Sequence, residues 1–483
     1  MKLRKTLISM LLGAAMFAGT VFTLPVTASA ANTSNPTVIA NSTASAIVLG
    51  SDVVFSATLN TLPSSDDGKA YLYELKTYEY GISAEAVPIA SCDLTKNINI
   101  RFPLNYVRGT VGRLYNKFVL AVKKNGVVSL VTDAQYITNP EMLATEIKVR
   151  KPRPAKALQG GNVANITLTG SGVALPIGAT HAVFQNDNKD AITVDATAHV
   201  ADTHPVKNNP VVGYMLNAND DAGIAGLVAD MTAYASDTHV QDFVIGNEVN
   251  ERCWNYMAWT DWDTYVRKYV QAFRVCYTAI KAVNPTAMVY ISLDQVWDKN
   301  PSGANYYEWL DGDQFMAKFN TMMLQNGNID WNMSIHPYPN PLYYAKFWDL
   351  SGVANGATYK AQVDKDQVIT FQNLSVITNL LTKPEYLNRV GGVRDVIIGE
   401  IGLGSNAGVD AQAAAICASY AAFERNPYVS QYLYLEVDVN GFYPTMTGRA
   451  LEAYNAMGTP MEAQYMEWAK SYIGITDWSQ VLR

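Results

Sequence analysis

From residue 181 to residue 435 the chain alternates short apolar runs with longer stretches of helical periodicity. The longest helical stretch is Trp262–Val283, which carries apolar residues at helical spacing and stops before Asn284-Pro285. Parallel strands are joined by crossover connections that are usually helices, so this alternation predicts a parallel sheet covered by helices. The strand candidates are His181–Gln185, Asp242–Gly246, Ala287–Leu293, Trp331–Ile335, the run ending at Glu400, and Tyr432–Leu435.

Two of these apolar runs end in a glutamate. Phe243–Ile245 leads into Gly246-Asn247-Glu248, and Val396–Gly399 leads directly into Glu400. Because the carboxyl ends of the strands of a (β/α)8 barrel meet at one rim, the pattern predicts two carboxyl groups facing one site. Cleavage of a glycosidic bond needs one carboxylic acid and one carboxylate. Glu248 and Glu400 are therefore the candidate catalytic pair; a helix-start glutamate and a structural salt bridge are the alternatives.

The first part of the chain has a different pattern. Residues 46–138 contain short β-type runs separated by turn signals, and Asn125-Gly126 between two of them predicts a hairpin. Lys151-Pro152-Arg153-Pro154 reads as a boundary. We therefore expect a small all-β sandwich over residues 31–150 and a barrel over residues 151–483. Too few residues separate His181 from Glu248 for three complete strand–helix units, so the barrel is expected to be shortened in its first half.

The N-terminus has the features of an export signal. Basic residues precede an apolar stretch from Leu7 to Phe22, and Ala28-Ser29-Ala30 follows as a cleavage site. We expect residues 1–30 to be a signal peptide and the protein to be secreted. No later stretch approaches the roughly 18 apolar residues of a membrane span.

Composition excludes several classes of partner. The formal net charge is −7 and no Lys/Arg cluster interrupts the acidic balance, which argues against nucleic acids and anionic membranes. The sequence lacks a Gly-rich phosphate loop, H-E-x-x-H, G-x-S-x-G and C-x-x-C, so neither a cofactor nor a metal is expected. The four cysteines leave open one disulfide or buried thiols.

The ordered set Asn247-Glu248, His336-Pro337-Tyr338 and Glu400 resembles clan A of the (β/α)8 glycoside hydrolases. The chain is also similar to an uncharacterised secreted bacterial family that pairs a β-sandwich with such a barrel. The resemblance covers residues 181–472 and places Glu248 at the end of the fourth strand and Glu400 at the end of the seventh. The clan's arginine after the second strand has no counterpart here, and Leu435-Glu436-Val437-Asp438 replaces its tryptophan after the eighth.

The resemblance implies that Glu248 is the acid/base and Glu400 the nucleophile, and it implies roles for the residues around them. Asn247 would hydrogen-bond a sugar 2-hydroxyl, a contact that strengthens in the transition state. His336 and Tyr338 would orient and polarise Glu400. The alternatives are a turn asparagine and a histidine with a packing role.

Three further residues near strand ends are candidate sugar contacts. Trp254 and Trp297 would stack on sugar rings, although core packing fits each equally well. Asp294 ends the fifth strand, where a polar sugar contact and a structural salt bridge are equally plausible. Glu251 lies about one turn beyond Glu248 and is expected to face solvent.

Three functions are consistent with the sequence. The first is a secreted retaining glycoside hydrolase acting on a polysaccharide or oligosaccharide. The second is a catalytically silent carbohydrate-binding or surface protein on a degenerate barrel. The third is an inverting hydrolase. The separation of the two carboxyl groups distinguishes the enzymes, since retention needs about 5–5.5 Å and inversion about 6.5–9.5 Å.

Overall fold

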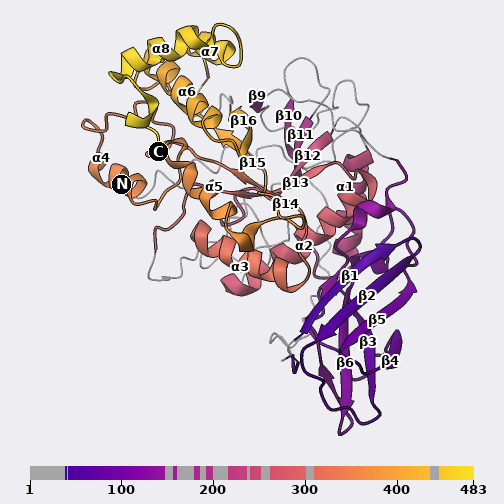
Figure 1. Cartoon of the computed structure of the whole chain (residues 1–483). Helices are drawn as coiled ribbons and strands as arrows, with labels where there is room; N and C mark the ends of the chain where they lie inside the picture. Colours follow the sequence, from indigo (N-terminus) through magenta and orange to yellow (C-terminus); the bar gives the residue numbers. More distant parts are fainter. Residues whose placement is uncertain are drawn as a thin grey trace, which may run out of the picture.

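The computed structural model describes residues 38–40, 42–146, 156–159, 179–184, 192–198, 216–236, 240–251, 261–300, 309–435 and 445–483. The expected signal peptide (residues 1–30) and Trp254 lie outside these ranges. Figure 1 shows two β-rich parts: an all-β part in indigo and purple, and a larger part with helices in magenta to yellow.

The all-β part is a sandwich of two antiparallel sheets. Inward-facing side chains of both sheets, such as Phe55, Phe102 and Phe118, belong to one apolar core, and alternate residues of β5 are buried and exposed. The first sheet has the order β1 (Ser42–Leu49), β2 (Asp52–Leu59), β5 (Asn97–Pro103). The second has the order β4 (Ala90–Asp93), β3 (Lys69–Leu75), β6 (Lys117–Lys124), β7 (Val127–Leu130), with β8 (Gln135–Tyr136) paired to β6.

The predicted hairpin at Asn125-Gly126 joins β6 to β7. Both residues have positive φ, 52° and 74°, as the two-residue turns that match strand twist require. The carboxylate of Asp66 accepts hydrogen bonds from both turn N–H groups at 2.9 and 3.1 Å. The positive φ values of Asn125 and Gly126 and the hydrogen bonds to Asp66 therefore stabilise this hairpin together.

The larger part is built on a closed barrel of eight strands. Counted from β9, the strands that end near Glu248 and Glu400 are the fourth and the seventh, as the sequence predicted. The strands are β9 (Lys156–Gln159), β10 (Ala179–Phe184), β11 (Ile192–Ala198), β12 (Val240–Ile245), β13 (Met288–Leu293), β14 (Trp331–Ile335), β15 (Val396–Ile401) and β16 (Val429–Leu435), and β16 pairs with β9 to close the circle.

The first half of the barrel departs from the all-parallel sheet that the alternation suggested. Strand β10 is antiparallel to both of its neighbours, whereas β11 to β16 and β9 are mutually parallel. Only residues 185–191 connect β10 to β11, and a parallel crossover needs about a dozen residues or more. The shortened first half is thus accommodated by one reversed strand within a closed barrel.

The strand–helix alternation is regular from β12 onward. The predicted helix Trp262–Val283 is α2, and its N-cap is Asp261, whose side chain accepts from Thr264 N at 2.8 Å. No helix in the described ranges combines the length and hydropathy that a membrane span requires. The helices are α1 (Asp221–Ser236), α2, α3 (Gly312–Gln325), α4 (Gly356–Asp364), α5 (Ser375–Leu381), α6 (Val409–Glu424), α7 (Gly448–Ala456) and α8 (Glu462–Ile473).

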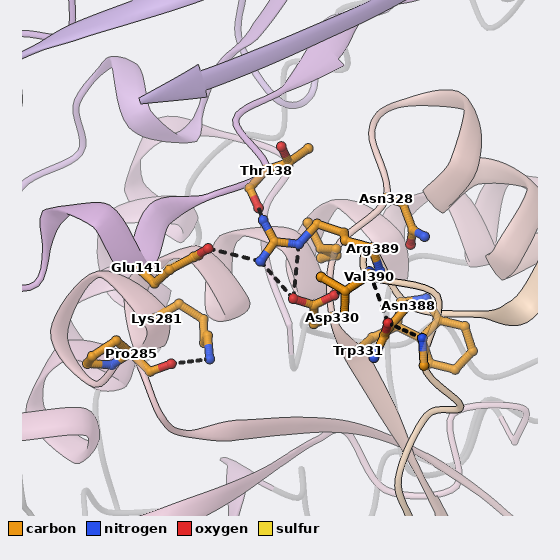
Figure 2. Close-up of polar contacts among 12 residues, drawn as sticks. Thr138, Glu141, Lys281, Pro285, Asn328, Asp330, Trp331, Asn388, Arg389 and Val390 are labelled. Atoms are coloured by element: carbon orange, nitrogen blue, oxygen red, sulfur yellow. Dashed lines mark hydrogen bonds and ion pairs between the residues drawn. The ribbon is translucent and has the colours of Figure 1, made fainter. Parts of the chain in front are cut away.

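The sandwich is fastened to the barrel through Arg389, as Figure 2 shows. Its guanidinium donates to Glu141 and Asp330 at 2.9 and 2.7 Å and to the Thr138 carbonyl at 2.6 Å. Burial alone would raise the pKa of Asp330, but the hydrogen bonds from Arg389 hold it below its ordinary value. Asp330 precedes β14 and His336 follows it, so this anchor lies at the opposite end of β14 from the candidate site.

The sandwich also forms hydrogen bonds with Asn326, which lies at the C-terminal end of α3. Tyr136 N donates to the Asn326 carbonyl at 3.0 Å, and Asn326 Nδ2 donates to the Ala134 carbonyl at 2.8 Å. Along the chain, the last described element of the sandwich is a 3-10 helix over Pro140–Leu143, and the first strand of the barrel, β9, begins at Lys156. The predicted boundary at 150/151 falls between them, outside the described residues.

Replacing Arg389 with alanine should lower the free energy of unfolding by about 2 kcal/mol, because hydrogen bonds to charged groups are lost and partly buried carboxylates lose their cation. The control is Arg101→Ala, which breaks an ion pair whose arginine side chain is 57% exposed. It should cost less than about 1 kcal/mol. Urea denaturation measures both, and equal losses would contradict the anchoring role of Arg389.

Candidate active site

The candidate site lies where β12 to β15 end. These four strands are consecutive in the barrel and parallel, so the residues that follow them meet at one rim. The structure brings together Glu248 after β12, His336 and Tyr338 after β14, and Glu400, which is the penultimate residue of β15.

The backbone at Glu248 is unusual. Its φ is +47°, in the left-handed region that residues other than glycine rarely adopt. Gly246 also has a positive φ, 83°, and Glu251 N donates to the Glu248 carbonyl at 2.7 Å. Glu248 therefore opens a tight turn, Glu248–Glu251, immediately after β12.

A closed ring of hydrogen bonds holds the Glu248 carboxyl. His336 Nδ1 lies 2.9 Å from Glu248 Oε1, and His336 Nε2 lies 3.2 Å from Ser292 Oγ. Ser292 Oγ in turn accepts from Glu248 N at 3.3 Å. The three residues come from the ends of β12, β13 and β14, so the ring ties three strands together. When Glu248 is ionised, its carboxylate requires a proton on His336 Nδ1, and Ser292 can then donate to Nε2.

His336 and Tyr338 were both predicted to orient Glu400, and the two side chains differ in their contacts. His336 Nδ1 is bound to Glu248. The Tyr338 hydroxyl donates to Glu400 Oε1. Tyr338 is 4% exposed and packs edge-on against Tyr343, with ring centroids 5.0 Å apart.

The pKa values of two of these groups are displaced. Burial raises the pKa of Glu248 above its ordinary value, and the charges of Glu400 and Asp294 add to this, while the contact with His336 opposes it. Burial, followed by the charge of Glu400, raises the pKa of the Tyr338 phenol well above its ordinary value. Tyr338 therefore keeps its proton and remains a donor to Glu400.

Gly399 makes room for Ser334 on the neighbouring strand. A Cβ at this position would lie 1.9 Å from Ser334 Oγ and 3.3 Å from His336 Nε2. The space beside this glycine is filled by protein side chains. Its lack of a side chain serves the packing of β14 against β15.

The remaining candidates in the described residues are also buried. Asn247 is 6% exposed and directly precedes Glu248. Trp297 is 5% exposed and packs so closely on Gly312 that a Cβ there would lie 2.7 Å from its ring. Trp297 therefore belongs to the core rather than to a sugar platform. Trp254, the other predicted stacking residue, lies outside the described residues.

Asp294 is also turned inward. It is 5% exposed, and its carboxylate accepts from Asn250 Nδ2 at 2.5 Å and from Val296 N at 2.9 Å. Burial and the charge of Glu251, to which Asp294 is also hydrogen-bonded, raise its pKa well above the ordinary value. Glu251, expected to face solvent, is thus engaged with Asp294. Ser292 and Asn250 are site residues that sequence reasoning did not single out.

An acidic cluster lies near the start of α3. Asp298, Asp311 and Asp313 place carboxylate oxygens within 4.8 Å of one another, the one such group among the described residues. The Asp311 carboxylate accepts two hydrogen bonds from Asn300, one from its backbone N–H at 2.5 Å and one from its side-chain amide at 3.1 Å. Burial raises the pKa of Asp313 to about 6.

A family profile matches residues 179–481, which is more than half of the chain and includes Glu248, His336, Tyr338 and Glu400. The chain belongs to the DUF5722 family. That family is described as being of unknown function. None of the curated proteins matches the sequence.

Solved structures that resemble this member of the DUF5722 family include three glycosidases. A β-glucuronidase from Ruminococcus gnavus is 9% identical, with 89% of this chain and 68% of that chain covered and a TM-score of 0.31. A hyperthermophilic β-glucosidase from Pyrococcus furiosus is 16% identical, with 55% and 63% covered and a TM-score of 0.33. An endo-β-1,3-glucanase of the GH128 family from Sorangium cellulosum is 12% identical, with 50% and 77% covered and a TM-score of 0.30.

The raised pKa of Glu248 has a consequence for stability. The folded state binds the proton of the Glu248 carboxyl more tightly than the unfolded state does. The stability contributed by this protonation is therefore complete below the pKa of glutamate in the unfolded chain, about 4.3. It is lost as pH rises through the folded pKa. Relative to wild type, Glu248→Gln should therefore become more stable between pH 4 and pH 8. Urea denaturation across that range measures the difference, and a difference that stays constant or shrinks would contradict the burial of this carboxyl.

Proposed function

We propose that this chain is a secreted glycoside hydrolase that cleaves a polysaccharide or oligosaccharide with retention of anomeric configuration. The observation that supports this best is the pairing of two glutamates at the ends of β12 and β15 in unlike surroundings. Glu248 is a largely buried carboxyl, its side chain 15% exposed, with a raised pKa beside a histidine. Glu400 accepts a hydrogen bond from a phenol. Two carboxyl groups with different environments are what acid/base and nucleophilic roles need.

Glu248 suits the acid/base role. A raised pKa keeps its proton over more of the pH range in which a leaving oxygen must be protonated. After the proton has gone to the leaving group, His336 Nδ1 can donate to the carboxylate that remains. The same carboxylate then accepts a proton from the water that attacks the intermediate.

Glu400 suits the nucleophilic role. Its carboxylate would attack the anomeric carbon as the glycosidic bond breaks, giving a covalent glycosyl-enzyme. Tyr338 donates to Oε1 and orients the carboxylate. Water activated by Glu248 would then displace Glu400, which returns the anomeric configuration to that of the substrate.

The first test is Glu400→Gln. The amide keeps the shape of the side chain but cannot act as a nucleophile, so turnover should fall by at least about 10³-fold while sugar binding persists. A panel of aryl glycosides and polysaccharides supplies the substrates, and NMR of the first product identifies its anomer. Full activity in this variant, or an inverted product from wild type, would exclude the retaining mechanism. Binding without turnover in wild type would favour the catalytically silent binding protein.

The second test is Glu248→Ala. Because poor leaving groups depend on protonation, kcat/KM on them should fall by about 10²- to 10⁴-fold, with much less loss on activated aryl glycosides. Added azide should restore part of the turnover on activated substrates by attacking the glycosyl-enzyme. Equal losses on good and poor leaving groups, with no azide effect, would count against Glu248 as the acid/base.

Secretion rests on the N-terminal residues 1–30. When expressed in a bacterial host, the protein should be exported and cleaved after Ala30, so that the mature chain begins at residue 31. N-terminal sequencing of the exported protein checks this, and an intact N-terminus on cytoplasmic protein would contradict it.

A further inference from the structure

The turn that begins at Glu248 contains a buried side chain, Asn250, that binds it to two other segments. Asn250 is fully buried, and each polar atom of its amide has a partner. Its Oδ1 accepts from Asp294 N at 3.0 Å, and its Nδ2 donates to Asp294 Oδ1 at 2.5 Å and to the Leu310 carbonyl at 3.2 Å. The backbone carbonyl of Asn250 also accepts from Leu310 N at 2.9 Å.

These contacts join three segments of the barrel rim. Asn250 belongs to the turn after β12, Asp294 directly follows β13, and Leu310 lies just before α3. Val249, the residue between Glu248 and Asn250, is held as well, because its N–H donates to the Ser292 carbonyl at 2.8 Å. The two residues after Glu248 are therefore both bound to the end of β13.

Glu248 itself needs such an anchor. Its left-handed φ of +47° is unfavourable for a residue with a side chain and persists only where surrounding structure enforces it. Glu248 is the first residue of the Glu248–Glu251 turn, and Asn250 is the third. If the turn were released, the backbone could relax and the carboxyl would leave His336 Nδ1.

We propose that Asn250 is the positioning residue for Glu248: by binding the turn to Asp294 and Leu310, it holds Glu248 in the conformation that directs its carboxyl to His336. Asp294 is the fixed end of this connection. Its carboxylate also binds Val296 N and Glu251, so both of the last two turn residues converge on it. The catalytic consequence rests on the proposed function, whereas the geometric consequence does not.

The chain offers a matched control. Asn284 is 2% exposed, and its Nδ2 donates to the Val240 carbonyl at 3.2 Å. Val240 begins β12 and Glu248 follows its end, so Asn284 stabilises the same strand at the opposite end. Asn284→Ala removes an asparagine that is about as buried as Asn250 but whose side chain binds the start of β12 rather than the Glu248–Glu251 turn.

The first measurement does not require activity. Imidazole 1H–15N spectra report the hydrogen bond at His336 Nδ1, with His336→Gln used for assignment. Asn250→Ala should shift or broaden the Nδ1–H resonance, while Asn284→Ala should leave it in place. An unchanged resonance in folded Asn250→Ala, or the same change in Asn284→Ala, would overturn the proposal.

The second measurement uses turnover on glycosides with poor and good leaving groups. Asn250→Ala should lower kcat/KM for the poor leaving groups about 100-fold, as expected when a catalytic group is misplaced by about 1 Å. Activated substrates should lose only a few-fold, and Asn284→Ala should separate the two classes far less. Equal losses on both classes would overturn the positioning role.

If Asn250→Ala does not fold, Asn250→Ser decides, because its single hydroxyl keeps a polar group at this buried position but can donate to only one of Asp294 and the Leu310 carbonyl. It should show the same change at His336. Failure of both variants to fold, with Asn284→Ala folded, would make Asn250 a purely structural residue and overturn the proposal. Absence of turnover in wild type would end the proposed function, and the spectra of His336 would still test the positioning of Glu248.

Discussion

The site depends on the hydrogen bond between His336 and Glu248. A buried carboxyl group needs a partner, and His336 supplies it from the neighbouring part of the rim. Ser292 lies against the far side of the imidazole, with its Oγ 3.2 Å from His336 Nε2. Glu248, in turn, reaches the histidine from a left-handed backbone conformation. Strand ends, a serine hydroxyl and a tight turn are thus all constrained by one contact.

The irregular features of the molecule lie away from this contact. The reversed strand β10 belongs to the first half of the barrel, whereas β12 to β15 are parallel and consecutive. The Arg389 anchor binds the sandwich at the other end of β14 from His336. A closed barrel therefore tolerates a short first half and an attached sandwich while its later strands keep the two glutamates at one rim.

Much of this frame could be predicted because it follows from local patterns. Apolar periodicity located β12 to β16 and α2, and the strand-end rule located Glu248 and Glu400. The partner of His336 could not be predicted, since it depends on how the ends of β12, β13 and β14 pack together and on the Ser292 hydroxyl beside Nε2. For Trp297 the sequence left sugar stacking and core packing equally open, and in the structure it is 5% exposed and its ring packs on Gly312. Asn250 gave no periodic signal, because its role arises from the turn that it anchors.

The claim that Glu400 forms a covalent bond to the sugar can be tested directly with a 2-deoxy-2-fluoro glycoside bearing an activated leaving group. Such a reagent slows hydrolysis of a glycosyl-enzyme more than its formation, so the intermediate accumulates. Peptide mass spectrometry of the treated protein should find one sugar attached to the peptide that contains Glu400, with no label in Glu400→Gln. A label on a different carboxylate, or turnover with no label and an inverted product, would contradict the account.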